Sequence, residues 1–240
     1  MGLLDIPAPL FAWLDARLNG WLPPVGIICL WGVLGALVSM ELYRLLSPQA
    51  RIRALKARLA RAQKQLSAHD GELDGAWPLI RRMLGLAVRR VGIVLPATLA
   101  ASLPLLALVV WLDTSYGRAF PEPGHHQGVA VEEPYRGTLV TNGDHMPARA
   151  EVRDDAGALV AEVELPAPVP VVHKRRGWNV LGGHPNGYRD ADGPLEHIAI
   201  DLPRKQYLSI GPDWLRGWEA AFFAALVLSS LAFKFARRIQ

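Results

Sequence analysis

The sequence predicts an α-helical membrane protein with three transmembrane helices, a cytoplasmic antiparallel coiled-coil hairpin and a small extracytoplasmic β-sandwich-like domain. Two observations support this fold class. First, the apolar runs 25–46, 91–112 and 214–233 each approach the roughly 20 residues needed to span a bilayer. Second, a short basic segment separates the first two runs, whereas a long polar region separates the last two.

These signals divide the chain into consecutive segments. Their expected roles are an amphipathic outer-interface segment (1–22), transmembrane helix 1 (23–47), the cytoplasmic coiled-coil hairpin (48–90), transmembrane helix 2 (91–113), a periplasmic β-rich domain (114–212), transmembrane helix 3 (213–234) and a cytoplasmic tail (235–240).

The distribution of charge predicts the orientation of the spans. Eleven Lys/Arg against three Asp/Glu lie between Arg44 and Arg90, whereas 113–213 holds ten against fifteen. Basic residues that flank spans stay cytoplasmic, so we expect a multi-pass protein of the bacterial inner membrane with its N-terminus outside and its C-terminus cytoplasmic. Helices beside anionic lipid are commonly basic, so membrane lipids are expected partners and specific nucleic-acid recognition is not.

The N-terminal segment does not read as a cleavable signal peptide, because Asp5 and Asp15 are present and a basic n-region is not. Pro9–Leu22 instead predicts a short amphipathic helix in the outer interface, where Trp is favoured. Cys29 is the single cysteine, so no intrachain disulfide can form.

The hairpin is predicted from two apolar seams with spacings of three and four residues. They comprise Ile52, Leu55, Leu59, Ala62 and Leu66 in the first arm, and Trp77, Ile80, Leu84, Ala87 and Val91 in the second. His69–Gly75 reads as the turn, and Pro78 suits the first turn of the second arm. No break signal precedes Pro96, so we expect one long helix to emerge from the bilayer.

The outer faces of the hairpin are basic. One interpretation is a rigid spacer with a solvated surface; the other is a docking arm for a negatively charged partner such as a ribosome, an anionic chain or lipid. The docking candidates are Arg51, Arg53, Lys56, Arg58, Arg61, Lys64, Arg81 and Arg82.

Polar side chains within the spans suggest a groove open to the cytoplasm. Its candidates are Thr98, Ser102, Ser229 and Ser230, with Arg44, Arg89 or Arg90 as a positive charge at the mouth. Pro96 and Pro104 add backbone carbonyls that need other partners. The alternative is ordinary hydrogen bonding between helices together with snorkelling arginines.

The order of these parts resembles the YidC/Oxa-type membrane insertase superfamily, above all its three-span branch, the archaeal YidC-like proteins and their endoplasmic-reticulum relatives. Ile93–Leu112 is similar to the family's second span, and Gly217–Phe223 with Phe233–Arg238 is similar to its third. The resemblance implies an inward-open groove whose positive charge receives hydrophilic parts of an inserting chain. The chain departs from the family in having few cytoplasmic methionines and in carrying its β-domain before the last span.

The region 114–212 predicts a small β-sandwich or barrel built from short strands. The expected strands are Gly137–Asn142, Ala148–Arg153, Leu159–Leu165, Val169–His173, His197–Leu202 and Gln206–Ile210. Asp154–Gly157 between alternating runs is a strong hairpin signal.

Chemistry-bearing motifs are scarce in this region. It contains His125, His126, His145, His173, His184 and His197, but none stands in a ligand motif, so neither a metal nor a cofactor is expected. The basic run His173–Arg176 is read as a solvated loop, or as a contact for lipid headgroups or an acidic partner. Trp178, Tyr188 and the loop Gly182–Gly187 could form the lip of a ligand site.

The sequence therefore leads to the expectation of a non-enzymatic factor for membrane-protein insertion or assembly, with nascent or assembling membrane proteins as partners. The alternative is a scaffold subunit of an inner-membrane complex, whose β-domain binds an envelope partner while the hairpin contacts a ribosome or another membrane subunit.

Overall fold

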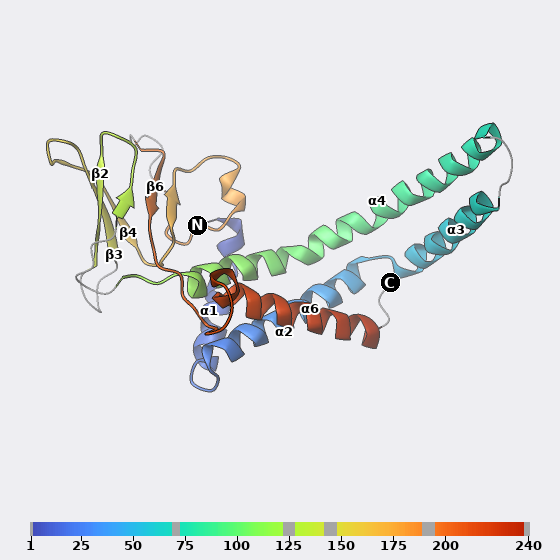
Figure 1. The fold of residues 1–240 in the computed structure, drawn as a ribbon, viewed down its shortest axis with the longest axis horizontal. Coiled ribbons are helices and arrows are strands. Elements are labelled where there is room, and N and C mark those ends of the chain that lie inside the picture. The colour runs from blue at the N-terminus through green and yellow to red at the C-terminus, as the bar shows by residue number, and fades with distance from the viewer. Residues whose placement is uncertain (1, 69–72, 122–127, 142–147, 189–194, 238–240) are drawn as a thin grey trace. The chain divides into compact units, whose positions relative to one another are not determined.

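The computed structural model describes residues 2–68, 73–121, 128–141, 148–188 and 195–237 (Figure 1). The chain forms two compact units. The first comprises Met1–Cys29 with Leu106–Phe223, and the second comprises Leu30–Leu105 with Ala224–Gln240. Residues 69–72 of the predicted turn His69–Gly75 lie outside the described residues, as do His125, His126 and His145, whereas the rest of that turn, Leu73–Gly75, is already part of a helix.

Three helices are long and apolar enough to span a membrane: α2 (Pro24–Leu46), α4 (Leu73–Leu112) and α6 (Trp218–Arg237). Leu95, Leu99 and Leu103 are exposed at four-residue intervals on α4, which gives this helix an apolar face suited to lipid. These features are those of a membrane protein with three candidate spans.

Helix α4 confirms the expected continuity between the basic segment and the second span. It runs for 40 residues through Pro78, Pro96 and Pro104, and Figure 1 shows one unbroken ribbon. At about 1.5 Å per residue such a helix is roughly 60 Å long, about twice the thickness of the hydrocarbon core. Its basic part therefore extends well beyond the apolar part.

The other arm is α3 (Gln49–Ser67), which begins directly after Pro48. Ile52, Leu55 and Ala62 of the predicted seam are buried. On α4 the matching positions Trp77, Leu84 and Val91 are exposed, so a coiled coil between the two arms stays a prediction.

The β-domain contains one six-stranded antiparallel sheet, with strand order β4-β3-β2-β1-β6-β5. The strands are β1 (Gly128–Ala130), β2 (Arg136–Val140), β3 (Ala148–Arg153), β4 (Leu159–Leu165), β5 (Val171–His173) and β6 (His197–Ile200). The predicted hairpin is confirmed, because β3 pairs with β4 and Gly157 adopts a φ of 82° in the turn. The described strands form a single sheet, so the sandwich is not confirmed.

Alternation along the strands builds the core of this domain. Ala148, Ala150 and Val152 on β3 are buried, and they pack with Ile198 and Ile200 of β6 in one cluster. Strand β1 was not predicted, because three residues are too few to show an alternating pattern.

The expected strand Gln206–Ile210 is not formed. The amides of Tyr207 and Leu208 donate to the carbonyl of Arg216, at the end of the short helix α5 (Asp213–Arg216), and not to a neighbouring strand. The hydroxyl of Tyr207 also donates to the carbonyl of Tyr116 at 3.0 Å. These contacts give the backbone amides of Tyr207 and Leu208 hydrogen-bond partners without sheet pairing.

The N-terminal segment forms the predicted helix, α1 (Ala8–Leu18), and packs through its polar residues. Asp15 is buried and accepts hydrogen bonds from the Tyr116 hydroxyl at 2.7 Å and the Asn19 amide at 3.0 Å. Phe11 packs against Trp111, with ring centroids 5.6 Å apart. Asp15 therefore links this segment to the rest of its unit through the hydrogen bond with Tyr116.

Candidate functional site

A pocket of about 380 Å³, here called the α4 groove, lies among the end of α2, α3 and α4. Tyr43 comes from α2, and Ile52 and Leu59 come from α3. From α4 come Arg90, Val94 and Thr98, among others, at intervals of four residues that place them on one face of the helix.

The groove combines an aliphatic wall with a few polar groups. The hydroxyl of Thr98 donates to the Val94 carbonyl at 3.1 Å, which leaves its oxygen able to accept from another group. The guanidinium of Arg90 carries five N–H donors. An acidic or hydrogen-bonding segment could therefore be bound here, whereas covalent chemistry has no obvious nucleophile and base.

Of the predicted groove residues, Arg90 and Thr98 line this pocket, and the others lie elsewhere. Arg44 pairs with Glu41 on the exposed side of α2, at 3.0 Å. Arg89 is exposed on α4. The other serine candidates bond within their own helices or lie on α6. Ser102 donates to the Leu99 carbonyl at 2.8 Å, and Ser229 donates to the Ala225 carbonyl at 2.5 Å. Ser230 is half-buried on α6.

Tyr43, Ile52 and Leu59 were missed as groove residues. The chain turns between α2 and α3 at Ser47 and Pro48, where the Gln49 side chain hydrogen-bonds the Ser47 hydroxyl. This short turn puts the first part of α3 near the end of α2. The sequence Ser47-Pro48 could have indicated the turn, but not which side chains would face α4.

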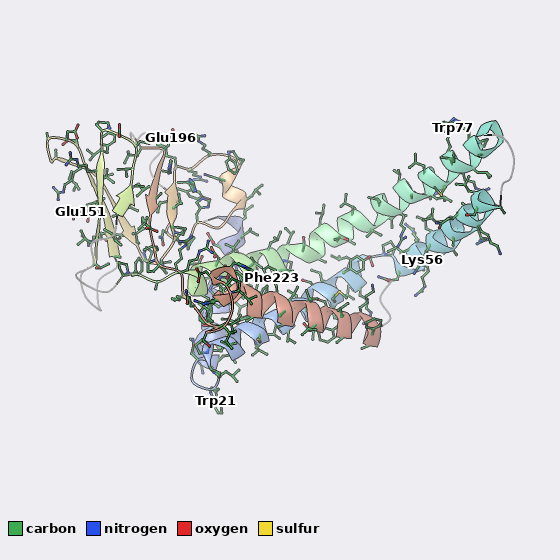
Figure 2. The ribbon with its side chains drawn as sticks, in the orientation of Figure 1. Trp21, Lys56, Trp77, Glu151, Glu196 and Phe223 are labelled. Carbon is green, nitrogen blue, oxygen red and sulfur yellow. The ribbon has the colours of Figure 1, made fainter. Side chains whose placement is uncertain are left out.

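The docking candidates on α3 and α4 are all exposed: Arg51, Arg53, Lys56, Arg58, Arg61, Lys64, Arg81 and Arg82. Figure 2 labels one of them, Lys56, on α3. The exposed basic face suits either the solvated spacer or the docking arm.

A second pocket, of about 620 Å³, is here called the β-domain pocket. It lies among β5, the loop that follows this strand, the short helix η4 (Asn179–Leu181) and the start of β6. Its lining includes His173, Lys174, Arg176, Trp178, His184 and Glu196. The expected lip therefore forms in part: Trp178 and His184 line the pocket, and Tyr188 stacks on His184 with ring centroids 4.3 Å apart.

The environment of His184 disfavours the protonated form of its imidazole. Burial lowers the pKa of His184, and the neighbouring His173 lowers it further, while Asp5 opposes the shift. Both ring nitrogens are shielded from solvent, and neither makes a hydrogen bond of ordinary geometry within the described part of the chain. Among the described residues, no three His, Cys, Asp or Glu side chains are arranged to hold a metal ion.

Comparisons of the chain with protein-family models, with curated proteins and with solved structures find no match. Function is therefore inferred from the two pockets, from the three candidate spans and from the distribution of charge.

Proposed function

We propose that this protein assists the insertion or assembly of other membrane proteins, with the α4 groove as the site that admits a hydrophilic segment. The observation that carries the proposal is that Arg90 and Thr98 share one pocket where the apolar part of α4 meets its basic part. Such a pocket offers a charge and hydroxyls at the edge of the hydrocarbon.

The physical reason is the cost of moving charge into lipid. A charged side chain at the centre of a bilayer costs about 2.5–3.5 kcal/mol on insertion scales, and more on an isolated helix. A groove that pairs Arg90 with an acidic residue of the client, and offers hydroxyl partners, lowers this cost. No bond is made or broken, so the proposed activity is not enzymatic.

The setting that we propose is the bacterial inner membrane, with the basic hairpin and C-terminus cytoplasmic and the β-domain periplasmic. The excess of Lys and Arg between residues 44 and 90 supports this orientation. The order of spans, basic hairpin and tail supports a relationship to the YidC/Oxa-type superfamily. The exposed basic face of α3 would then dock a ribosome or the client itself.

The test replaces the groove cation, Arg90, and compares the effect with that of replacing its neighbour, Arg89. We expect Arg90→Gln to reduce insertion of a client with a short acidic translocated loop about fivefold, the factor given by about 1 kcal/mol for a partly solvated charge pair. Insertion is measured by protease protection of the loop in cells that depend on this protein.

The matched control is Arg89→Gln, because Arg89 is exposed on the same helix and does not line the groove. Equal losses for the two variants would point to a general effect of charge at the membrane surface. Unchanged insertion in both variants, and in the triple variant that also replaces Arg44, would rule out the groove.

A scaffold function is the second candidate, and the β-domain pocket favours it, because a binding site there has no obvious part in insertion. Deleting 120–210 separates the two functions. An insertion factor keeps partial activity without this domain, whereas a scaffold that binds an envelope partner fails.

A further inference from the structure

The β-domain pocket is large enough for a ligand, and both charged and apolar side chains line it. Its volume of about 620 Å³ falls within the range of roughly 300–1,000 Å³ that is usual for ligand sites. Cationic and imidazole side chains line one part of it. Trp178 and Leu181 line another part, although 76% of the Trp178 surface and 64% of the Leu181 surface are exposed.

The charge of the pocket favours an anion. Lys174, Arg175 and Arg176 follow one another in the loop after β5. Glu196, which Figure 2 labels in the β-domain, precedes β6, pairs with Arg176 and lies 3.9 Å from the Lys174 ammonium. Two cations of the pocket lining, Lys174 and Arg176, thus share one carboxylate, in a domain whose sequence is acidic elsewhere.

The loop after β5, which lines the pocket and is here called the pocket loop, packs on the end of the candidate span α4. An added Cβ on Gly183 would lie 2.0 Å from Cγ1 of Val110, so the loop backbone packs directly on α4, two residues before this helix ends. Asp5 holds the same loop, since its carboxylate accepts from the amide of His184 at 2.7 Å. If α4 spans the bilayer, this end of it lies near the lipid headgroups.

We propose that the β-domain pocket binds an anionic phospholipid, with the headgroup phosphate between Lys174 and Arg176 and the acyl chains against Trp178 and Leu181. Trp and basic side chains are the residues that favour the interface between headgroups and acyl chains. The imidazoles of His173 and His197 lie beside the cations, with ring centroids 6.4 Å apart, and offer further donors to a phosphate. This site is independent of the proposed insertion function.

The experiment titrates the full-length chain, in neutral detergent, with short-chain phosphatidylglycerol and follows binding by calorimetry. We expect Lys174→Gln/Arg176→Gln to weaken binding at least tenfold, because it removes charge-assisted hydrogen bonds to the phosphate. Trp178→Ala, at an exposed position, should weaken binding of the lipid but not of inorganic phosphate.

Arg149→Gln is the control, because Arg149 is an exposed cation of the same domain that pairs with Glu162 and lies outside the pocket. Equal affinity for phosphatidylcholine, or an undiminished affinity in the double variant, would overturn the proposal. Inorganic phosphate binding as tightly as phosphatidylglycerol would show an anion site that does not select lipid, and would overturn it too.

Discussion

At the residue scale, the two buried carboxylates of the N-terminal segment have specific hydrogen-bond partners, and these explain where this segment packs. Asp15 is buried because the Tyr116 hydroxyl and the Asn19 amide both donate to it. Asp5 accepts from the amides of Gly2 and His184. Each carboxylate would be costly without those donors, so the contacts select one position for the N-terminal segment within its unit.

His184 is the residue whose environment predicts a pH dependence. Its pKa is lowered, first by burial and then by His173, while Asp5 acts in the opposite direction. Below about pH 6.5 the unfolded chain therefore binds a proton that the folded chain does not, and the free energy of unfolding falls as the pH falls.

We expect thermal unfolding of the detergent-solubilised protein to shift downward between about pH 7 and pH 5, and to shift less in His184→Gln. The measurement is the unfolding midpoint of both proteins across this range. Parallel pH profiles for the two proteins would contradict the assignment to His184.

At the element scale, the loop after β5 packs closely on α4 because Gly183 has no side chain. Gly183 lies so close to Val110 that any Cβ would clash, whereas Gly177 in the same loop has open space around it. We expect Gly183→Ala to cost about 1–3 kcal/mol in unfolding free energy, and Val110→Ala to recover much of this loss in the double variant.

Chemical denaturation of the single and double variants checks the coupling, with Gly177→Ala as the control. A double variant no more stable than Gly183→Ala alone would show that the loop does not pack on α4 in this way.

The elements that the sequence predicted well are those with a long or regular signal. The apolar runs predicted α2, α4 and α6, and Asp154–Gly157 predicted the β3–β4 hairpin. Short or irregular elements were missed, as β1 and the segment at Gln206 show. Their conformation depends on neighbours that are distant in sequence, and local pattern does not report such contacts.

The candidate site was predictable to a similar degree. Arg90 and Thr98 are eight residues apart on one helix, a spacing that is visible in the sequence, and both line the groove. Tyr43 and Leu59 reach it only through the turn between α2 and α3. The β-domain pocket was signalled by Trp178 and the Gly182–Gly187 loop, but its cations come from a run that the sequence alone did not distinguish from a solvated loop.

At the scale of the whole molecule, charge and hydrophobicity are separated along the chain. The three candidate spans carry few charges, residues 44–90 are strongly basic and the β-domain is acidic outside its pocket. This distribution is what a protein needs if one part contacts a polyanion or an incoming chain while another lies beyond the membrane. We propose that such a chain enters at the α4 groove.

The most direct test is photo-crosslinking in cells from position 98, with position 99 as the matched control. Thr98 lines the groove, whereas Leu99 lies on the exposed apolar face of the same helix. The account predicts short-lived crosslinks from position 98 to many nascent membrane proteins, with mainly lipid adducts from position 99. Crosslinks from position 98 to one stoichiometric membrane protein would contradict it, and would identify the groove as a subunit interface of a scaffold.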